Sequence, residues 1–302
     1  MDDKLTKTFM RVCQQGSIRA VAIELEQEPS TISRRLSALE NELNIQLLER
    51  RRKGVIPTEA GELLLAHLRG QATEFEALTA ELDALRGMRR GSVSLAVGEG
   101  FVSDLIKNAL PDFKNTYPEI TFSIRSGTTE TVVQDVQNDT AHLGFVFNAV
   151  QDRQCKVLAK MPQPLELLVS PKTSWAHANA PVSIDMLTDM PLALLMPGSG
   201  IGSLVRDVEA IYGVRFKQAL EVNSLTAVLN FVREGLGVTV FPAFVAAREI
   251  EDHAITTLPL SIPKFASGEV RLISRAGRRL PDATMKFADH AMRSMQAFRV
   301  AT

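Results

Sequence analysis

The sequence has no run of about 18 apolar residues, which is the length that a membrane-spanning helix requires. Its first residues, MDDKLTKTFMRV, are acidic and lack the apolar segment of a secretory signal. We therefore expect a cytoplasmic protein without a membrane partner. Cysteine is scarce, because Cys13 and Cys155 are the only two and lie far apart. Two reduced cytosolic thiols are expected; the alternative is a redox-switch pair, for which the two residues would have to meet across domains.

The motifs of common enzyme classes are also missing. The sequence contains no GxSxG, no HExxH and no Walker loop, and His177, His253 and His290 have no partner at motif spacing. No cysteine and histidine residues show zinc-site spacing. We therefore expect a protein that is not an enzyme and has neither a metal nor a cofactor.

One glycine-rich loop resembles a nucleotide-binding loop without matching it. Gly198, Gly200 and Gly202 alternate with other residues, but the spacing is not GxGxxG and the loop lies in the middle of the chain. Glu221, at about the right distance for a ribose contact, is the only further support. A dinucleotide-dependent enzyme is therefore a disfavoured alternative.

Length and charge leave several classes open. A chain of 302 residues with 45% hydrophobic residues is expected to form two or more domains. The net charge of −1 does not indicate whether nucleic acid is a partner. Residues 1–57 carry ten basic and eight acidic side chains, and six of the basic ones form two clusters, at 34–35 and 50–53. This clustering is more informative than the total charge.

The first sixty residues predict three short helices. Apolar residues recur at helical spacing up to residue 13, and Gly16 with the N-capping Ser17 then interrupts the helix. A second helix is expected over 18–25. Pro29 suits the first position of a third helix, where its missing N–H has no cost.

The third helix has the features of a DNA-recognition helix. One face is apolar, and the opposite face carries hydroxyl and arginine side chains near the N-terminal end. In a helix-turn-helix, this end enters the major groove, where hydroxyls and Arg contact base edges and phosphates. The alternative is an exposed polar face of a surface helix. The predicted DNA contacts on this helix are Ser30, Thr31, Ser33, Arg34 and Arg35.

A basic hairpin is predicted directly afterwards. Four consecutive basic residues, 50–53, precede Gly54, as expected for a β-wing that lies along the phosphate backbone. Arg51, Arg52 and Lys53 are the predicted phosphate contacts. Thr58 then suits the N-cap of the next helix.

A long helix follows, from Thr58 to about Arg86. Its apolar residues are spaced by three or four, as in a coiled coil, and its length is roughly 43 Å at 1.5 Å per residue. A helix of this length would pair with a second copy; the alternative is that it lies on its own domain. The hinge is predicted at 87–91. The predicted seam is Leu64, Leu68, Ala72, Phe75, Leu78, Leu82 and Leu85.

From Ser92 onward, predicted strands alternate with helices, which indicates a parallel sheet covered on both faces. At about 210 residues, two lobes are expected. Ligands bind beyond the carboxyl ends of such strands. Four segments qualify, and their backbone N–H groups and hydroxyls suit an anionic organic effector. They are 99–103, 126–129, 197–203 and 222–224.

The first part of the chain resembles the DNA-binding domain of LysR-type transcriptional regulators. The pieces AVAIELE, STISRRLSALENELNIQLLER and PTEAG stand in the order and spacing of that family. One departure is that Glu28-Pro29 replaces the usual Ser-Gln pair that opens the recognition helix. The resemblance implies that the long helix is a dimerising linker.

The second part resembles the family's effector-binding domain, in the stretches ALPDFKNTYPEITFSI and FVREGLGVTVFP. His142 stands near the place where the family commonly has an Asp; it is either a titrating sensor or a satisfied structural histidine. The resemblance implies that effector contacts fall at Phe101, Ser103, Thr128, Thr129, Ser199, Gly200, Ile201, Gly202 and Asn223.

The complete prediction is an α/β multidomain protein with three parts. Residues 1–58 form a winged helix-turn-helix, 59–88 a linker helix, and 89–302 a two-lobed domain resembling periplasmic binding proteins, with lobes 92–162 plus 267–302 and 163–266. It would regulate transcription on a near-palindromic operator as a homodimer or homotetramer, controlled by a small effector, with RNA polymerase as a further candidate partner. The alternative is a small-molecule-binding protein with no role on DNA.

Overall fold

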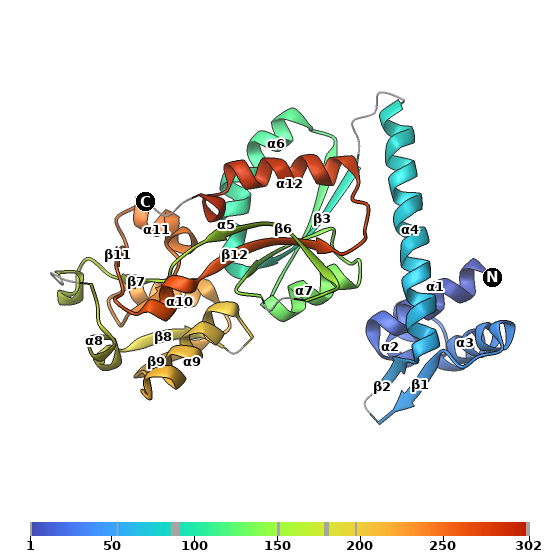
Figure 1. Cartoon of the computed structure of the whole chain (residues 1–302), viewed down its shortest axis with the longest axis horizontal. Coiled ribbons are helices and arrows are strands. Elements are labelled where there is room, and N and C mark those ends of the chain that lie inside the picture. The colour runs from blue at the N-terminus through green and yellow to red at the C-terminus, as the bar shows by residue number, and fades with distance from the viewer. Residues whose placement is uncertain are drawn as a thin grey trace. The chain divides into compact units, whose positions relative to one another are not determined.

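The computed structural model describes residues 2–52, 54–85, 91–149, 152–177, 181–196 and 198–299 (Figure 1). The chain divides into two compact units, Met1–Thr79 and Ala80–Thr302. The predicted phosphate contact Lys53, the predicted helix end at Arg86 and positions 87–90 of the predicted hinge lie outside the described residues. Among the helices that are described, none combines the length and the apolar character needed to cross a membrane.

Three helices form the body of the first unit, at the predicted places. They are α1 (Asp3–Gln15), α2 (Ile18–Glu24) and α3 (Pro29–Leu43). Ser17 caps α2, because its hydroxyl accepts a hydrogen bond from the amide of Ala20 at 3.2 Å. Their apolar faces meet in one core that contains Phe9, Val12, Val21, Ile32, Leu36 and Leu39.

A two-stranded antiparallel wing follows, formed by β1 (Leu48–Arg51) and β2 (Gly54–Pro57). It is attached to the turn between α1 and α2, because the amide of Val55 donates to the carbonyl of Gly16 at 2.8 Å. Gly54 has φ +138°, and a Cβ there would lie 2.3 Å from the same carbonyl oxygen. Only glycine permits this close approach.

The long helix α4 (Glu59–Leu85) begins where Thr58 caps it, with the Thr58 hydroxyl 3.1 Å from the amide of Gly61. Its first turns bury Leu65 and Leu68 in the core of the first unit. Further along, Phe75 and Leu78 are 71% and 51% exposed. The predicted seam is therefore divided: its beginning packs on its own domain, and the next apolar residues have no cover.

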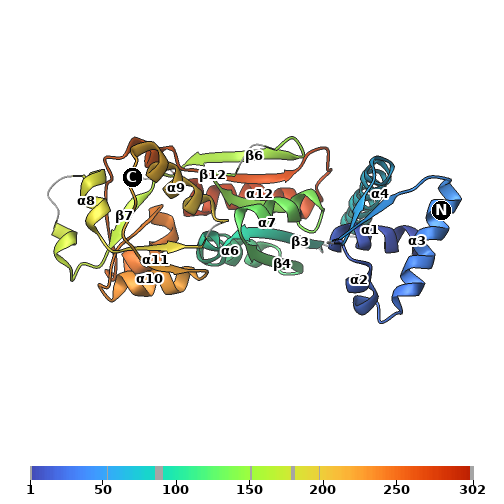
Figure 2. The same cartoon turned by 90° about the horizontal axis from the view of Figure 1, so that it is seen from below.

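The second unit contains a five-stranded sheet in the order β4-β3-β5-β12-β6 (Figure 2). β3, β4 and β5 are parallel, whereas β12 is antiparallel to both of its neighbours. The expectation of a parallel sheet is therefore wrong for β12, which runs opposite to the other four strands. The strands are β3 (Gly91–Gly98), β4 (Ile120–Gly127), β5 (Leu143–Phe147), β6 (Cys155–Pro162) and β12 (Glu269–Arg275).

Helices cover both faces of this sheet (Figure 1). α6 (Leu110–Thr116) and α12 (Asp282–Ser294) lie on one face, where Phe113 packs edge-on against Phe287 with ring centroids 5.1 Å apart. α7 (Thr129–Gln137) lies on the other face and buries Val132 and Val136. We call this sheet with its helices the first lobe.

The helix that precedes α6 is irregular for a local reason. α5 (Val102–Asp104) continues into a π-helical turn, Leu105–Ala109, in which the amide of Leu110 donates to the carbonyl of Leu105. Pro111 comes next, and a proline ring clashes with the carbonyl four residues earlier in a regular α-helix. The wider π turn gives the ring space, and the side chain of His290 bonds the carbonyl of Ala109 at 3.0 Å.

The second lobe comprises residues between β6 and β12. It contains the antiparallel sheet β10-β7-β11 and the parallel pair β8-β9, so the parallel expectation holds here for β8 and β9 and is wrong for β10-β7-β11. The strands are β7 (Glu166–Val169), β8 (Leu192–Leu195), β9 (Gln218–Val222), β10 (Thr239–Phe241) and β11 (Thr256–Leu258). The helices are α8 (Ile184–Asp189), α9 (Gly200–Tyr212), α10 (Leu225–Arg233) and α11 (Ala247–Glu251).

The chain crosses between the lobes twice, after β6 and before β12. The buried residue Gln163 joins the two crossing segments. The amide N–H of Gln163 donates to the carbonyl of Gly268 at 2.8 Å. Its side-chain amide donates to the carbonyls of Ala297 at 3.0 Å and Arg299 at 2.8 Å. The two crossings and the C-terminal segment are thereby fixed to one another.

Asp104 is a buried carboxylate that the first lobe satisfies completely. It is 4% exposed and accepts hydrogen bonds from the backbone amides of Gln296 at 2.9 Å and Ala297 at 2.8 Å. The side chain of Asn108 donates to it as well, at 2.8 Å. These bonds join α5 to the short turn that follows α12.

Replacing Asp104 by alanine is expected to lower the free energy of unfolding by about 2–5 kcal/mol, because two backbone N–H groups lose their acceptor. Urea unfolding followed by the fluorescence of Trp175, the single tryptophan of the sequence, measures this. The exposed Asp112→Ala, on α6, is the control and should change it by less than about 1 kcal/mol. Equal stability of the two variants would contradict a structural role for Asp104.

Candidate functional site

The first candidate site is the N-terminal part of α3. Ser30 and Arg34 are exposed and lie four residues apart, so their side chains share one face of the helix. Thr31 is half-buried. Pro29 is the first residue of the helix and has no backbone N–H that needs an acceptor. The Glu28 carboxylate at the N-cap forms no capping hydrogen bond. The outward face of the helix therefore presents a hydroxyl and a guanidinium.

Two of the predicted contact residues of α3 have partners within the protein. The hydroxyl of Ser33 accepts a hydrogen bond from the guanidinium of Arg50 at 2.9 Å. Arg35 is half-buried, and its guanidinium reaches the hydroxyl of Thr8 on α1 at 3.5 Å. These contacts attach the wing to α3 and α3 to α1.

The wing carries the remaining predicted basic side chains. Arg51 and Arg52 are exposed, and Arg51 forms a surface ion pair with Glu49 at 3.2 Å. Arg50, which the sequence prediction did not include among the contacts, links the wing to the recognition helix. The sequence shows Arg50 as part of the basic run, but the direction in which its side chain points depends on how the hairpin folds.

The second candidate site is a cleft of about 910 Å³ in the second unit, lined by both lobes. All but one of the predicted effector contacts line it. The exception is Gly202, whose amide lies inside α9 and donates to the hydroxyl of Ser199 at 2.9 Å. The predicted residues that line the cleft are Phe101, Ser103, Thr128, Thr129, Ser199, Gly200, Ile201 and Asn223.

Direct hydrogen bonds join the lobes on one side of the cleft. The amide of Thr129, at the start of α7, donates to the carbonyl of Gly198 at 3.2 Å. In return, the amide of Gly200, at the start of α9, donates to the Thr129 hydroxyl at 3.1 Å. A Cβ at Gly200 would lie 1.8 Å from the carbonyl oxygen of Phe147, so the lobes meet here through backbone atoms.

A carboxylate joins the lobes at a second place. Glu99 follows β3, and its side chain accepts a hydrogen bond from the amide of Leu225, the first residue of α10, at 2.9 Å. Carboxylates are favoured at helix N-termini, where backbone N–H groups are unpaired and the helix dipole is positive. Glu99 thus occupies a position at which a bound anion would otherwise fit.

Two further contacts join the lobes near Glu99. The rings of Phe101 and Phe244 lie 5.3 Å apart, and Lys107 forms an ion pair with Glu251 of α11.

The sequence prediction missed part of the lining of the cleft. Some of these residues lie at the ends of strands β3, β5 and β8 or directly after β8 and β10, and the others lie in α10 and α11. The strand-end rule, applied to the ends of β5 and β10 as well, would have found more of the first group. The missed residues are Gly98, Phe147, Leu195, Met196, Leu225, Thr226, Leu229, Phe244, Val245, Arg248 and Glu249.

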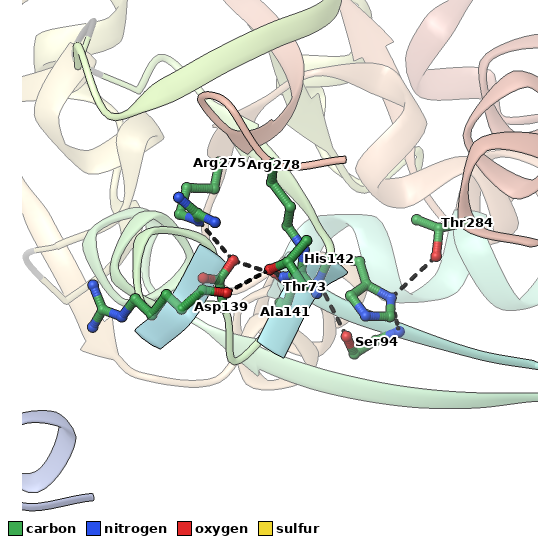
Figure 3. Close-up of polar contacts among 9 residues, drawn as sticks. Thr73, Ser94, Asp139, Ala141, His142, Arg275, Arg278 and Thr284 are labelled. Atoms are coloured by element: carbon green, nitrogen blue, oxygen red, sulfur yellow. Dashed lines mark hydrogen bonds and ion pairs between the residues drawn. The ribbon is translucent and has the colours of Figure 1, made fainter. Parts of the chain in front are cut away.

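His142 belongs to the interior of the first lobe, and it is not among the residues that line the cleft (Figure 3). It is 4% exposed. Its Nδ1 accepts a hydrogen bond from the amide of Ser94 at 3.2 Å, and the hydroxyl of Thr284 lies 3.1 Å from the same nitrogen. These two contacts hold the ring between β3 and α12. Of the two alternatives, the satisfied structural histidine is the one that this geometry favours.

A half-buried cluster of one carboxylate and two guanidinium groups lies next to it (Figure 3). Asp139 accepts hydrogen bonds from Arg275 and Arg278, both at 2.8 Å. Asp139 has φ +58°, a conformation that Asp tolerates better than most residues. The cluster holds the turn between α7 and β5 against the end of β12, and it lies outside the lining of the cleft.

The chain thus combines a winged helix-turn-helix with a two-lobed α/β unit that encloses a cleft, which is the architecture of a ligand-responsive DNA-binding protein. Two family models match it. The bacterial regulatory helix-turn-helix protein, lysR family, matches residues 4–62, and the LysR substrate binding domain matches residues 86–296. The chain belongs to the LysR family: it is a LysR-type DNA-binding transcriptional regulator with an effector-binding domain.

Individual relatives agree with this assignment. The uncharacterized HTH-type transcriptional regulator YeiE of Escherichia coli K12 is 23% identical over 94% of both chains. A full-length OxyR variant from Pseudomonas aeruginosa has a TM-score of 0.69 at 19% identity and covers 98% of this chain and 96% of its own. Full-length CbnR in complex with its target DNA has a TM-score of 0.54 at 23% identity, with 99% and 100% covered.

The two cysteines are protected by their surroundings. Burial raises the pKa of Cys13 from 9.0 to about 12, with a further contribution from Glu62 that Arg69 partly offsets. Burial also raises the pKa of Cys155 from 9.0 to about 11, and Asp152 adds to the effect. Both thiols are therefore protonated at neutral pH, which favours two reduced thiols over a redox pair.

We expect alkylation of the folded protein by iodoacetamide near pH 8 to be slower than that of free cysteine by about 100-fold or more, because the thiolate is the reactive form. Mass spectrometry of the tryptic peptides follows both residues separately. Unfolding in concentrated urea should restore the ordinary rate at both. Rapid alkylation of either residue in the folded protein would contradict the raised pKa values.

Proposed function

We propose that residues 1–58 recognise an operator through α3 and the wing, that residues 59–88 pair two subunits, and that residues 89–302 bind the effector. The observation that carries the DNA part is the exposed pair Ser30 and Arg34, placed on the outward face of α3 with the exposed bases of the wing in the same unit. In a helix-turn-helix, the N-terminal end of the second helix contacts base edges.

The contacts separate into two kinds. Arg34 is proposed to read a base, since a free guanidinium can bond guanine through two donors. Ser30 and Thr31 contact base edges or phosphates next to it. Arg51 and Arg52, with Lys53, are proposed to bind phosphates. Ser33 and Arg35 are proposed to act by holding the wing and α1 in position, since their side chains already have partners there.

Pairing through α4 is supported by the apolar side chains that its later turns leave uncovered, Phe75, Leu78 and Leu82. A symmetric dimer would place two α3 helices about one DNA turn apart, so we propose a near-palindromic operator. CbnR, whose fold this chain shares, was solved in complex with its target DNA.

The cleft is proposed to bind a small organic effector with an acidic group. Thr128, Ser199 and Asn223 contribute two hydroxyls and a side-chain amide to its lining, and each of these groups can donate a hydrogen bond to an acidic group. Because both lobes line the cleft, a ligand that contacts both favours one arrangement of the lobes over another. This differential binding would couple the effector to the arrangement of the dimer on DNA.

Replacing Arg34 by alanine is expected to weaken binding to the native operator by about 1–3 kcal/mol, roughly 5- to 150-fold, and to leave binding to a scrambled duplex almost unchanged. Fluorescence anisotropy with the DNA upstream of the protein's own gene measures both. Lys7→Ala, which removes an exposed base of α1 paired with Asp3 at 2.7 Å, is the control. Unchanged operator affinity would contradict the role of α3 in recognition.

The double replacement of Arg51 and Arg52 by alanine should weaken binding to every duplex. The slope of log K against log salt should become shallower by about 1.8, because each phosphate contact contributes about 0.9. Titrations at several salt concentrations provide this slope. If the slope were the same as in the unaltered protein, the wing would not lie along the phosphates.

A further inference from the structure

Several helices begin at the cleft, but many of the backbone N–H groups at their N-termini are already hydrogen-bonded within the protein. An anion at a helix N-terminus is bound by unpaired backbone N–H groups. Here, groups of the chain itself already accept from several of those amides. The pairs are Thr131 with the hydroxyl of Thr128, Gly200 with that of Thr129, Gly202 with that of Ser199, Leu225 with the carboxylate of Glu99, and Ala227 with the hydroxyl of Ser224.

The charged side chains in the lining are mainly acidic. Glu99, Arg248 and Glu249 are the charged residues among those that line the cleft in the described part of the chain. The guanidinium of Arg248 lies 3.8 Å from Asp252, one turn further along and outside the lining, and its side chain is 76% exposed. An exposed ion pair of this kind leaves the charge of Arg248 in place, so the described lining carries two carboxylates and one largely exposed guanidinium.

Glu99 and Glu249 both line the cleft, and the segments that carry them pack next to each other. The loop that carries Glu99 packs against the segment leading to α11, since a Cβ at Gly100 would lie 3.1 Å from Val245. The rings of Phe101 and Phe244, from the same two segments, pack together. Glu249 lies in α11, which begins two residues after Val245. The two residues thus line the cleft from neighbouring segments of opposite lobes.

Neither carboxylate is fully used by the protein. One oxygen of Glu99 accepts from Leu225, and the structure records no partner for the other oxygen within the described residues. The half-buried carboxylate of Glu249 has no hydrogen bond or ion pair there either. The surrounding wall is apolar, which strengthens the interaction of a carboxylate with any cation that enters.

We propose that the effector is an amino carboxylate, whose protonated amine is bound by Glu249 and the free oxygen of Glu99. This inference rests on the proposed function of the cleft and specifies its ligand class. The acidic group of the effector lies toward Thr128, Ser199 and Asn223, whose hydroxyls and side-chain amide can donate hydrogen bonds to it. An ammonium group supplies three donors, whereas a simple carboxylate brings a like charge toward two acidic side chains.

The test uses matched probes that differ in the amine alone. The full chain is mixed with each of the proteinogenic amino acids and with its deaminated carboxylate, and thermal unfolding and calorimetric titration measure binding. A ligand that binds the folded state raises the unfolding temperature. We expect at least one amino acid to bind, and its deaminated counterpart to bind about tenfold more weakly or less, since tenfold corresponds to about 1.4 kcal/mol.

Two variants locate the amine. Glu249→Gln should weaken binding of that amino acid by about tenfold or more, because a charge-assisted hydrogen bond is roughly twice as strong as a neutral one. It should leave the deaminated counterpart unaffected. Glu234→Gln is the matched control, since this residue ends α10 outside the cleft lining, is 58% exposed and pairs with Arg233.

Three outcomes would overturn the inference: equal binding of amino acids and deaminated acids, equal binding by the Glu249→Gln and unaltered proteins, or no binding by any amine. The proposed function is tested separately by adding each probe to the operator titration. A deaminated acid that binds and alters DNA affinity would keep the regulatory function and reject the amino carboxylate. An amino acid that binds through Glu249 without altering DNA affinity would keep the amino carboxylate as the ligand and reject the regulatory function of the cleft.

Discussion

The cleft depends on one close contact between backbone segments, at which the start of α9 meets the end of β5 and the start of α7. The amides at a helix N-terminus need acceptors, and here the opposite lobe supplies them: Thr129 accepts from Gly200 and donates to Gly198. The approach is close enough that a Cβ at Gly200 would overlap the carbonyl oxygen of Phe147. A hydrogen-bonding requirement local to one helix therefore fixes how the two lobes meet, and the positions of the hydroxyls and carboxylates in the cleft follow from it.

The same kind of constraint organises the DNA-binding unit. Gly16 ends α1 in a left-handed conformation, and its carbonyl then accepts the amide of Val55 from the wing. Gly54 permits the contact because it has no side chain to oppose it. Arg50 attaches the wing a second time, through Ser33. The basic hairpin and the recognition helix are thus presented as one surface, although they are separate in the sequence.

Periodic and capping signals allowed much of the fold to be predicted. Ser17, Pro29 and Thr58 mark the starts of helices where the structure has them, because each satisfies or avoids an unpaired N–H locally. Strand direction was harder to predict. The sheet of the first lobe was expected to be parallel throughout, but β12 returns from the second lobe and runs antiparallel to β5 and β6. No local pattern distinguishes a returning strand, since its direction depends on the path of the whole chain.

The sequence by itself determined the class of the protein, the three helices of the DNA-binding unit and the strand-end segments that form the cleft, because periodicity, caps and strand ends are local properties of the chain. The tertiary structure alone decided how those groups are used. Ser33 and Arg35 look equivalent to Ser30 and Arg34 in the sequence, yet packing turns them toward the wing and α1. Glu249 cannot be told from other surface residues in the sequence, and it lines the cleft because the segment before α11 packs against the loop of Glu99. Which side chains remain free to bind a ligand depends on distances between segments far apart in the chain, and these distances exist only in the folded protein.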